Sequence, residues 1–184
     1  MGDIRMWRSV VLACAALAAQ PGYAQAMAEP PATYGPPIAL GNALFVVERG
    51  GELAAQCGLT MAFAVVEPSG ELVAFVRMDG IPYASIRLAQ QKARTSARFR
   101  MTTAEFEERV QNGRAVLMSS DEVIAIGGGV PIVEDGRVIG ALGVSGGTAA
   151  QDGAVAAAAM APIEDGPDQE SASIDPCAGL ASDH

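Results

Sequence analysis

The sequence predicts an α+β protein in which helices cover a mainly antiparallel sheet. Two apolar segments each contain a central turn with glycine beside proline, serine or an acid, which is typical of β-hairpins. Segments with helical spacing of apolar residues give the order helix, hairpin, two helices, hairpin, helix. Because hairpin strands pair antiparallel, this order favours one sheet with helices packed against it.

The first helix is predicted from Ile38 to Gly58, where glycine is typical of a helix C-terminus. Gly50-Gly51 interrupts its pattern. The apolar residues that fall near a 3.6-residue period are Leu40, Leu44, Val47, Leu53 and Ala54. The first hairpin follows, with strands over 61–67 and 71–77 around the turn Pro68-Ser69-Gly70.

Two helices are predicted between the hairpins. The first runs from Tyr83 to Arg98 and has a narrow seam of mostly small residues: Ile86, Ala89, Ala93 and Ala97. Longer polar side chains point away from this seam: Arg87, Gln91, Arg94 and Arg98. A shorter helix begins at Thr102 or Thr103, where Glu105 and Glu107 complement the helix dipole.

The last third predicts a second hairpin and a final helix. Residues 123–126 can enter a strand, and Gly127-Gly128-Gly129 forms a bend. Strands over 130–133 and 137–144 pair around an Asp-Gly turn, which is a strong hairpin signal. An alanine-rich helix then runs from about Ala149 to Ala161, and Pro162 ends it.

Residues 1–26 are predicted to be a cleavable signal peptide. Arg5 and Arg8 precede the apolar run 10–19, and Ala24-Gln25-Ala26 is a small-x-small cleavage site. The run falls short of the ~20 residues of a membrane span, and Cys14 lies too close to Arg8 for a lipoprotein site. The mature chain is therefore expected to be periplasmic or secreted, and not an integral membrane protein.

Two further segments flank the predicted domain, which covers residues 38–161. Residues 27–37 contain four prolines and are expected to form an extended linker. Residues 162–184 carry six acids and no lysine or arginine, as in a disordered acidic tail. Cys57 and Cys177 remain after cleavage. They can form a disulfide in an oxidising compartment; a buried Cys57 with an unpaired Cys177 is the alternative.

The charge of the chain limits its partners. The net charge is −9, and loss of Asp3, Arg5 and Arg8 with the leader gives −10. A nucleic-acid partner is not expected, because such binding depends on basic residues that neutralise phosphates. Half of the ten remaining basic residues lie close together, which indicates a site for a small anionic ligand or a contact with another subunit: Arg87, Lys92, Arg94, Arg98 and Arg100.

Two long segments resemble the GlcG/HbpS family. They are VVEPSGELVAFVRMDGIPYASIRLAQQKARTSA and GGGVPIVEDGRVIGALGVSGGTAAQD, within a resemblance that spans residues 38–161. The resemblance implies a profilin-like fold and homo-oligomers, from dimers to octamers. Some members are extracellular haem-binding proteins, others accompany glycolate metabolism, and a related domain forms the C-terminal part of the corrinoid enzyme PduO. Family membership therefore implies a fold more firmly than a function.

Lys92, the only lysine of the chain, is the first candidate site residue. A lysine on a helix rich in small residues can bind a ligand carboxylate or act as a general base, and a surface lysine is the alternative. Asp79 either orients Lys92, serves as a base, or only caps the turn with the following glycine. Arg77, Met78 and Arg94 are the other ligand-binding residues predicted along this segment.

The glycine-rich segments supply the remaining candidates. Gly128 and Gly129 are assigned to the ligand site, together with Ser145-Gly146-Gly147-Thr148. This second turn precedes a helix, so its N–H groups can hold a carboxylate, and close packing against a neighbouring subunit is the alternative. Neither segment fits a nucleotide-binding fingerprint. Asp152 is interpreted as an acid that compensates the dipole of the last helix.

The single histidine, His184, belongs to the predicted tail. Its position excludes a Ser-His-Asp triad or a histidine metal site in the domain and weighs against histidine-ligated haem. No metal site is predicted. Haem would need Tyr, Met, Cys or Thr at its iron, or it would be held by its propionates and apolar faces.

Three functions follow from these residues. We expect an exported homo-oligomer that binds haem or a related tetrapyrrole, with basic residues meeting the carboxylates of the ligand. The alternative is a lyase or isomerase acting on a small organic carboxylate, with Lys92 and Asp79 in acid–base roles. An accessory oligomer without a ligand is the third.

Overall fold

The computed structural model describes residues 32–161 and Cys177. The predicted signal peptide, residues 27–31 of the predicted linker and the predicted disordered tail, apart from Cys177, lie outside the described residues. In chain order the elements are β1 (Thr33–Tyr34), α1 (Leu40–Gln56), β2 (Ala62–Val66), β3 (Leu72–Arg77), α2 (Tyr83–Phe99), α3 (Thr103–Gln111), the 3-10 helix η1 (Ala115–Ser119), β4 (Gly129–Glu134), β5 (Arg137–Ser145) and α4 (Ala149–Met160).

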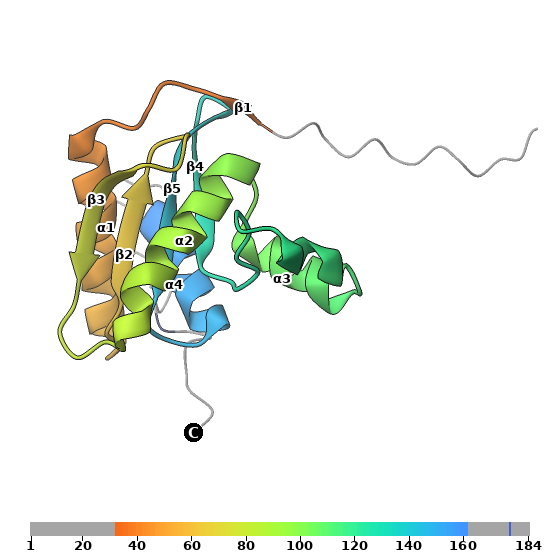
Figure 1. Cartoon of the computed structure of the whole chain (residues 1–184). Coiled ribbons are helices and arrows are strands. Elements are labelled where there is room, and N and C mark those ends of the chain that lie inside the picture. The colour runs from red at the N-terminus through yellow and green to blue at the C-terminus, as the bar shows by residue number, and fades with distance from the viewer. Residues whose placement is uncertain (1–31, 162–176, 178–184) are drawn as a thin grey trace, which may run out of the picture. The chain divides into compact units, whose positions relative to one another are not determined.

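The sheet is built around β5. This strand pairs antiparallel with β2 along one edge and with β4 along the other, and β3 extends the sheet beyond β2. The short β1 pairs parallel with the start of β5, so the chain joins the sheet before residue 38. Both predicted hairpins are present (Figure 1). The turn between β4 and β5 has positive φ at Asp135 and Gly136, as a tight two-residue hairpin turn requires.

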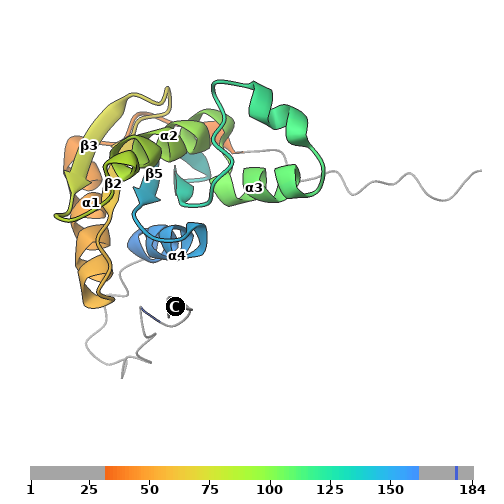
Figure 2. The same cartoon turned by 60° about the horizontal axis from the view of Figure 1, so that its bottom comes forward.

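Helices cover both faces of the sheet. α2 packs on one face, against β2, β4 and β5, whereas α1 and α4 pack together on the other (Figure 2). Alternation along β2 supplies both cores. Phe63 and Val65 face α1 and α4, whereas Ala62, Ala64 and Val66 face α2. The predicted α+β class, with a mainly antiparallel sheet covered by helices, is confirmed.

Small residues allow α2 to lie very close to the sheet. Ala89, Ala93 and Ala97 are fully buried. Ala89 and Ala93 face Gly143 of β5, where a Cβ atom would lie 2.0 Å from the carbonyl oxygen of Ala89. The predicted seam of α2 is thus its contact with the sheet, and side-chain size sets the distance between the two layers.

A glycine-to-alanine pair tests this close approach. Gly143→Ala is expected to destabilise the protein by about 1–3 kcal/mol, because the added methyl overpacks the contact with α2. Gly41→Ala in α1 is the matched control, since no atom lies within 4 Å of its Cβ position and alanine favours a helix by about 1 kcal/mol. Thermal unfolding followed by circular dichroism measures both variants. Equal melting temperatures would contradict the packing described here.

The buried face of α1 differs from the predicted pattern. Leu40 and Leu44 are exposed, and the residues that face the core are Ala43, Val46, Val47, Gly50 and Ala54. Gly50 does not interrupt the helix. A Cβ atom at that position would lie 2.7 Å from the ring of Phe63, so the glycine makes room for this large core side chain.

The prediction of a strand at residues 123–126 is wrong. Instead, the N–H of Ile124 donates to Oγ1 of Thr95 (3.1 Å), and that hydroxyl donates to the carbonyl of Glu122 (3.0 Å). These bonds hold the segment against α2 and leave it without a strand partner. The preceding helix α3 begins as predicted, with a capping box formed by Thr102 and Glu105.

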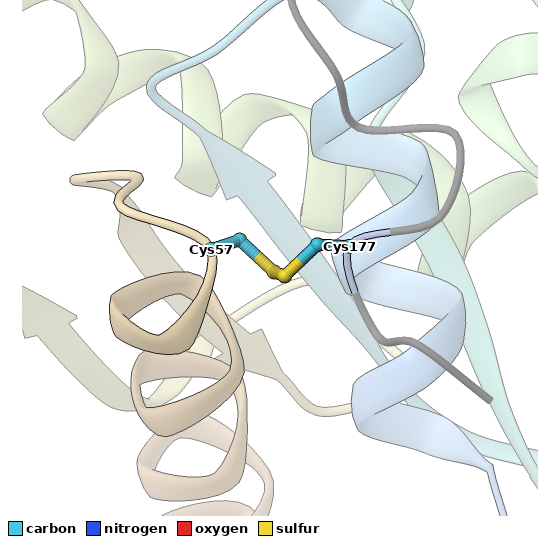
Figure 3. Close-up of a disulfide and its surroundings, with 2 residues drawn as sticks. All are labelled: Cys57 and Cys177. Carbon is cyan, nitrogen blue, oxygen red and sulfur yellow. A yellow bond between two sulfur atoms is a disulfide. The ribbon is translucent and has the colours of Figure 1, made fainter. Parts of the chain in front are cut away.

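Cys57 and Cys177 form a disulfide (Figure 3). Their Cα atoms lie 5.4 Å apart, and the bond joins the C-terminal end of α1 to a residue 120 positions later. Of the two alternatives for these cysteines, the structure therefore contains the disulfide. The loop closed by this bond includes β2 to β5 and α2 to α4.

Candidate functional site

The side chain of Lys92 is buried and links the helices on opposite faces of the sheet. Its Nζ donates to Oδ2 of Asp152 in α4 (2.6 Å) and to the carbonyl oxygen of Val144 in β5 (3.0 Å). The two charged side chains are only 1% and 3% exposed. Burial removes both charged groups from water, which is energetically costly. The ion pair and its hydrogen bonds offset this desolvation cost.

Asp152 is held from two sides. Its second carboxylate oxygen accepts a hydrogen bond from the N–H of Gly147 (2.9 Å). Burial raises the pKa of Asp152 above its ordinary value, while Lys92 and the N–H of Gly147 oppose this shift. Asp152 lies in the first turn of α4, as its interpretation as a dipole-compensating acid requires, and it also neutralises Lys92.

Two glycines make space for the ion pair where β4 begins. At Gly128, with φ of 119°, a Cβ atom would lie 2.8 Å from Cβ of Asp152 and 3.0 Å from Nζ of Lys92. At Gly129 a Cβ atom would lie 2.5 Å from the carbonyl oxygen of Lys92. Any larger residue at these positions would displace the pair or α2 itself.

The turn from Ser145 to Thr148 completes this arrangement, and its N–H groups already have partners. Gly147 donates to Asp152, Thr148 donates to Oε1 of Gln151 (2.9 Å), and the N–H of Gln151 donates to the Thr148 hydroxyl (3.2 Å). Ser145 is buried. The carboxylate at this helix N-terminus is thus the protein's own.

The predicted glycine-rich site and Lys92 therefore come together around an ion pair that is already formed. We name the residues around this buried pair the buried ion-pair cluster: Lys92, Gly128, Gly129, Ser145, Gly146, Gly147, Thr148 and Asp152. Gly147 and Thr148, at its edge, are exposed. In this structure Asp152 already occupies Lys92, so a ligand carboxylate would have to displace it, and the ligand site assigned to these residues stays a prediction. The partner lies 60 residues away in the chain, which sequence spacing did not reveal.

Of the three alternatives for Asp79, the structure does not contain the one in which this residue orients Lys92. Asp79 is fully exposed after β3, and its carboxylate lies 3.8 Å from Nη2 of Arg77. The sulfur of Met78 accepts a hydrogen bond from the N–H of Met61 (3.3 Å). Strand register places Arg77 and Met78 at the same end of the sheet as the 145–148 turn, without assembling an acid–base pair with Lys92.

An open pocket lies on the opposite, outer side of α2, beside the β2–β3 turn. We name it the α2 pocket. Its volume is about 350 Å³, within the ~300–1,000 Å³ typical of small-molecule sites. Its lining residues are Val66, Gly70, Glu71, Leu72, Arg87, Gln90, Gln91 and Arg94. Four of these, at positions 87, 90, 91 and 94, have the i, i+3, i+4, i+7 spacing of one helix face.

The two arginines of the α2 pocket differ in their contacts. Arg94 donates from Nε to the carbonyl of Gly70 (3.2 Å), and its Nη2 lies 3.7 Å from Glu71. Arg87 is exposed and forms no ion pair with any residue in the described part of the chain. The pocket therefore presents one guanidinium fixed by the hairpin turn and one available to an anionic ligand.

A smaller pocket of about 180 Å³ lies on the other side of Arg94. It includes Asp121 and Glu122, and Glu122 is ion-paired with Arg98. Its acidic lining disfavours an anion. The α2 pocket, lined by two arginines and one acid, Glu71, therefore has the more positive lining of the two.

The family is evident from comparison with known proteins. The family model of haem degrading protein HbpS-like matches residues 38–161. The chain belongs to the HbpS-like family. The matched region contains both the buried ion-pair cluster and the α2 pocket.

Relatives of this HbpS-like chain are known in sequence and structure. GlcG of Escherichia coli is 41% identical over 100 residues, covering 54% of this chain and 75% of GlcG. Corrinoid adenosyltransferase PduO of Salmonella typhimurium is 33% identical over 122 residues, covering 64% of this chain and 36% of PduO.

Two solved structures share the fold. The crystal structure of a PduOC:haem complex matches with a TM-score of 0.64 and 28% identity, over 70% of this chain and 96% of that chain. The crystal structure of a double mutant of Streptomyces reticuli HbpS matches with a TM-score of 0.65 and 25% identity, over 78% and 96%. Both cover nearly the whole of the solved chains, so the HbpS-like fold accounts for the described domain.

The HbpS-like region contains no histidine, since His184 lies beyond it. Among the described residues, no group of three or more His, Cys, Asp or Glu side chains is arranged to hold a metal ion. No helix in residues 32–161 is long and apolar enough to cross a bilayer.

Proposed function

We propose that the chain binds haem or a related tetrapyrrole in the α2 pocket. Membership of the HbpS-like family and the likeness to a PduOC:haem complex support this class of ligand. The observation that carries the placement is the pair of guanidinium groups, Arg87 and Arg94, in one open pocket. A tetrapyrrole carries carboxylates on its edge, and arginine binds carboxylates through its planar fork of donors.

The lining suits the edge of the ligand. Arg87 and Arg94 are seven residues apart, so they lie about 10 Å apart along the helix axis and can meet two carboxylates of one molecule. Gln91 lies between them with an amide that can donate a further hydrogen bond. Leu72, half-exposed beside the pocket, offers apolar contact to the macrocycle.

The lining suits the iron of haem less well. Haem iron in proteins is held by histidine, cysteine, methionine or tyrosine. None of these residues lines the α2 pocket. Bound haem would supply redox and oxygen chemistry at its iron, whereas this chain would bind and orient the macrocycle through its carboxylates.

Hemin titration of the mature protein tests the proposal. We expect a shifted Soret band that saturates at a fixed stoichiometry per chain. A spectrum equal to the sum of free hemin and protein would overturn it.

Arginine variants test the position of the site. Arg87→Ala and Arg94→Ala are each expected to weaken hemin binding about tenfold, the lower end for a charge-assisted hydrogen bond, because both side chains are partly exposed. Arg114→Ala on the distant η1 end is the control with the same change of charge, and should bind as the wild type does. If Arg77→Ala lost hemin binding while both pocket variants bound as the wild type does, the site would lie at the end of β3 and not in the α2 pocket.

Export and self-association belong to the same proposal. The disulfide supports an oxidising compartment, in agreement with the predicted signal peptide. Exposed apolar side chains at Tyr83, Val116 and Met118 support contacts between copies. The range of assemblies, from a dimer to an octamer, is what the family resemblance implies. Protein exported by its host should begin at Met27, and light scattering should give at least a dimer. An intact N-terminus would contradict export with cleavage, and a monomer at micromolar concentration would contradict self-association.

A further inference from the structure

We infer that the α2 pocket recognises a tetrapyrrole by its carboxylates and not by its metal, so that iron-free tetrapyrroles bind as tightly as haem. This inference rests on the proposed function and adds to it the class of ligand: dicarboxylate tetrapyrroles, metallated or not. Its basis is a mismatch within one pocket, which holds two cationic side chains and no customary iron ligand.

The pocket contains two guanidinium groups that can meet the two carboxylates of a ligand, and one acid, Glu71, which lies 3.7 Å from Arg94. Arg87 lacks an ion-pair partner among the described residues, and Arg94 is held in place by the carbonyl of Gly70. The positive φ of Gly70, at 91°, and its contact with the Arg94 side chain fix this arrangement, because a Cβ atom there would lie 2.9 Å from Cγ of Arg94. One guanidinium is therefore preorganised, and ligand binding need not order it.

Residues that commonly ligate iron lie elsewhere and have other contacts. Cys57 is bonded to Cys177, and the hydroxyl of Tyr34 donates to the carbonyl of Arg98 (2.6 Å). The sulfur of Met78 accepts a backbone N–H. Glu71, the one carboxylate of the pocket, lies beside the guanidinium of Arg94. None of these groups is placed to hold an iron atom above the α2 pocket.

Tyr83 is the strongest competitor to this inference. It is 87% exposed and lies one helical turn before Arg87, on the same side of α2. Tyrosine is one of the residue types that ligate haem iron, although Tyr83 does not line the pocket. The experiment therefore includes Tyr83→Phe, which removes the hydroxyl and keeps the ring.

The test compares four probes on the mature protein: hemin, protoporphyrin IX and the dimethyl ester of each. Absorbance and porphyrin fluorescence give each dissociation constant. We expect hemin and protoporphyrin IX to bind within about threefold of each other, and both esters to bind at least about tenfold more weakly, because esterification removes the charges that the arginines meet. Tyr83→Phe should leave the ratio of the two acids unchanged, and the double variant Arg87→Ala/Arg94→Ala should lose both.

Each other outcome has a separate meaning. Hemin that binds at least about tenfold more tightly than protoporphyrin IX would overturn the inference but leave the proposed function intact. Loss of this preference in Tyr83→Phe would then assign the iron to that tyrosine. Esters that bind as well as the acids would also overturn the inference. Failure of all four probes would instead refute the proposed function.

Discussion

Lys92→Met is expected to lower the free energy of unfolding by about 3–5 kcal/mol, because it leaves the Asp152 carboxylate buried without its cation. The ammonium lies 2.6 Å from the carboxylate, and both side chains are almost completely buried. Urea unfolding of the variant and the wild type measures the difference. Unchanged stability would show that the pair is absent or solvated in solution.

The effect of Lys92→Met should depend on pH. Burial already raises the pKa of Asp152, and loss of the opposing ammonium raises it further. Between the unfolded pKa of about 3.9 and the raised folded value, the native state keeps a proton that the unfolded state has lost, so stability falls as pH rises. The difference in unfolding free energy between wild type and variant should therefore be smallest near pH 4 and increase toward neutral pH. A gap that narrows as pH rises would contradict this explanation.

A double variant separates the ion pair from the packing around it. In Lys92→Met/Asp152→Leu both charges are gone, and an apolar pair of similar size occupies their place. We expect this variant to recover most of the stability lost in Lys92→Met, because replacing a whole buried pair is often neutral whereas removing one partner is costly. A double variant as unstable as the single one would show that side-chain shape, rather than charge, holds α2 and α4 together.

Loss of the disulfide is expected to cost about 2–4 kcal/mol, the usual range for a structural disulfide. Cys57 and Cys177 are separated by 120 residues, so the bond restricts a long loop of the unfolded chain. Cys57→Ser/Cys177→Ser should lower the urea midpoint of the mature protein. A reductant should destabilise the wild type to the same degree and leave the variant unchanged. Equal midpoints for oxidised wild type and variant would contradict a stabilising role.

Local signals predicted most of the fold. The turn residues at 68–70 and 135–136 defined both hairpins, and the alanine seam of α2 was identified by its helical spacing. Residues 123–126 were expected to enter a strand, but the N–H of Ile124 donates to the Thr95 hydroxyl. This hydrogen bond joins residues that are far apart in the chain, so the local sequence pattern could not predict it.

The site was predictable only in its parts. The singular Lys92 and the glycine-rich turns indicated a special environment, and they do meet in the structure. Their ligand is Asp152, which sequence reasoning assigned to the helix dipole alone. The sequence predicted the α2 pocket only in part. Arg87 and Arg94 were identified as members of a basic group. Gln90 and Gln91 lie on the same helix face, and their spacing could have predicted the other pocket residues of α2.

A crystal structure of the mature protein with hemin tests the tetrapyrrole site most directly. We predict electron density for the macrocycle over the outer side of α2, with its propionates within hydrogen-bond distance of Arg87 and Arg94. The iron should lie away from any side chain of the α2 pocket, and Lys92 should remain paired with Asp152. A haem seated at the 145–148 turn, with Lys92 released from Asp152 to a propionate, would contradict the account.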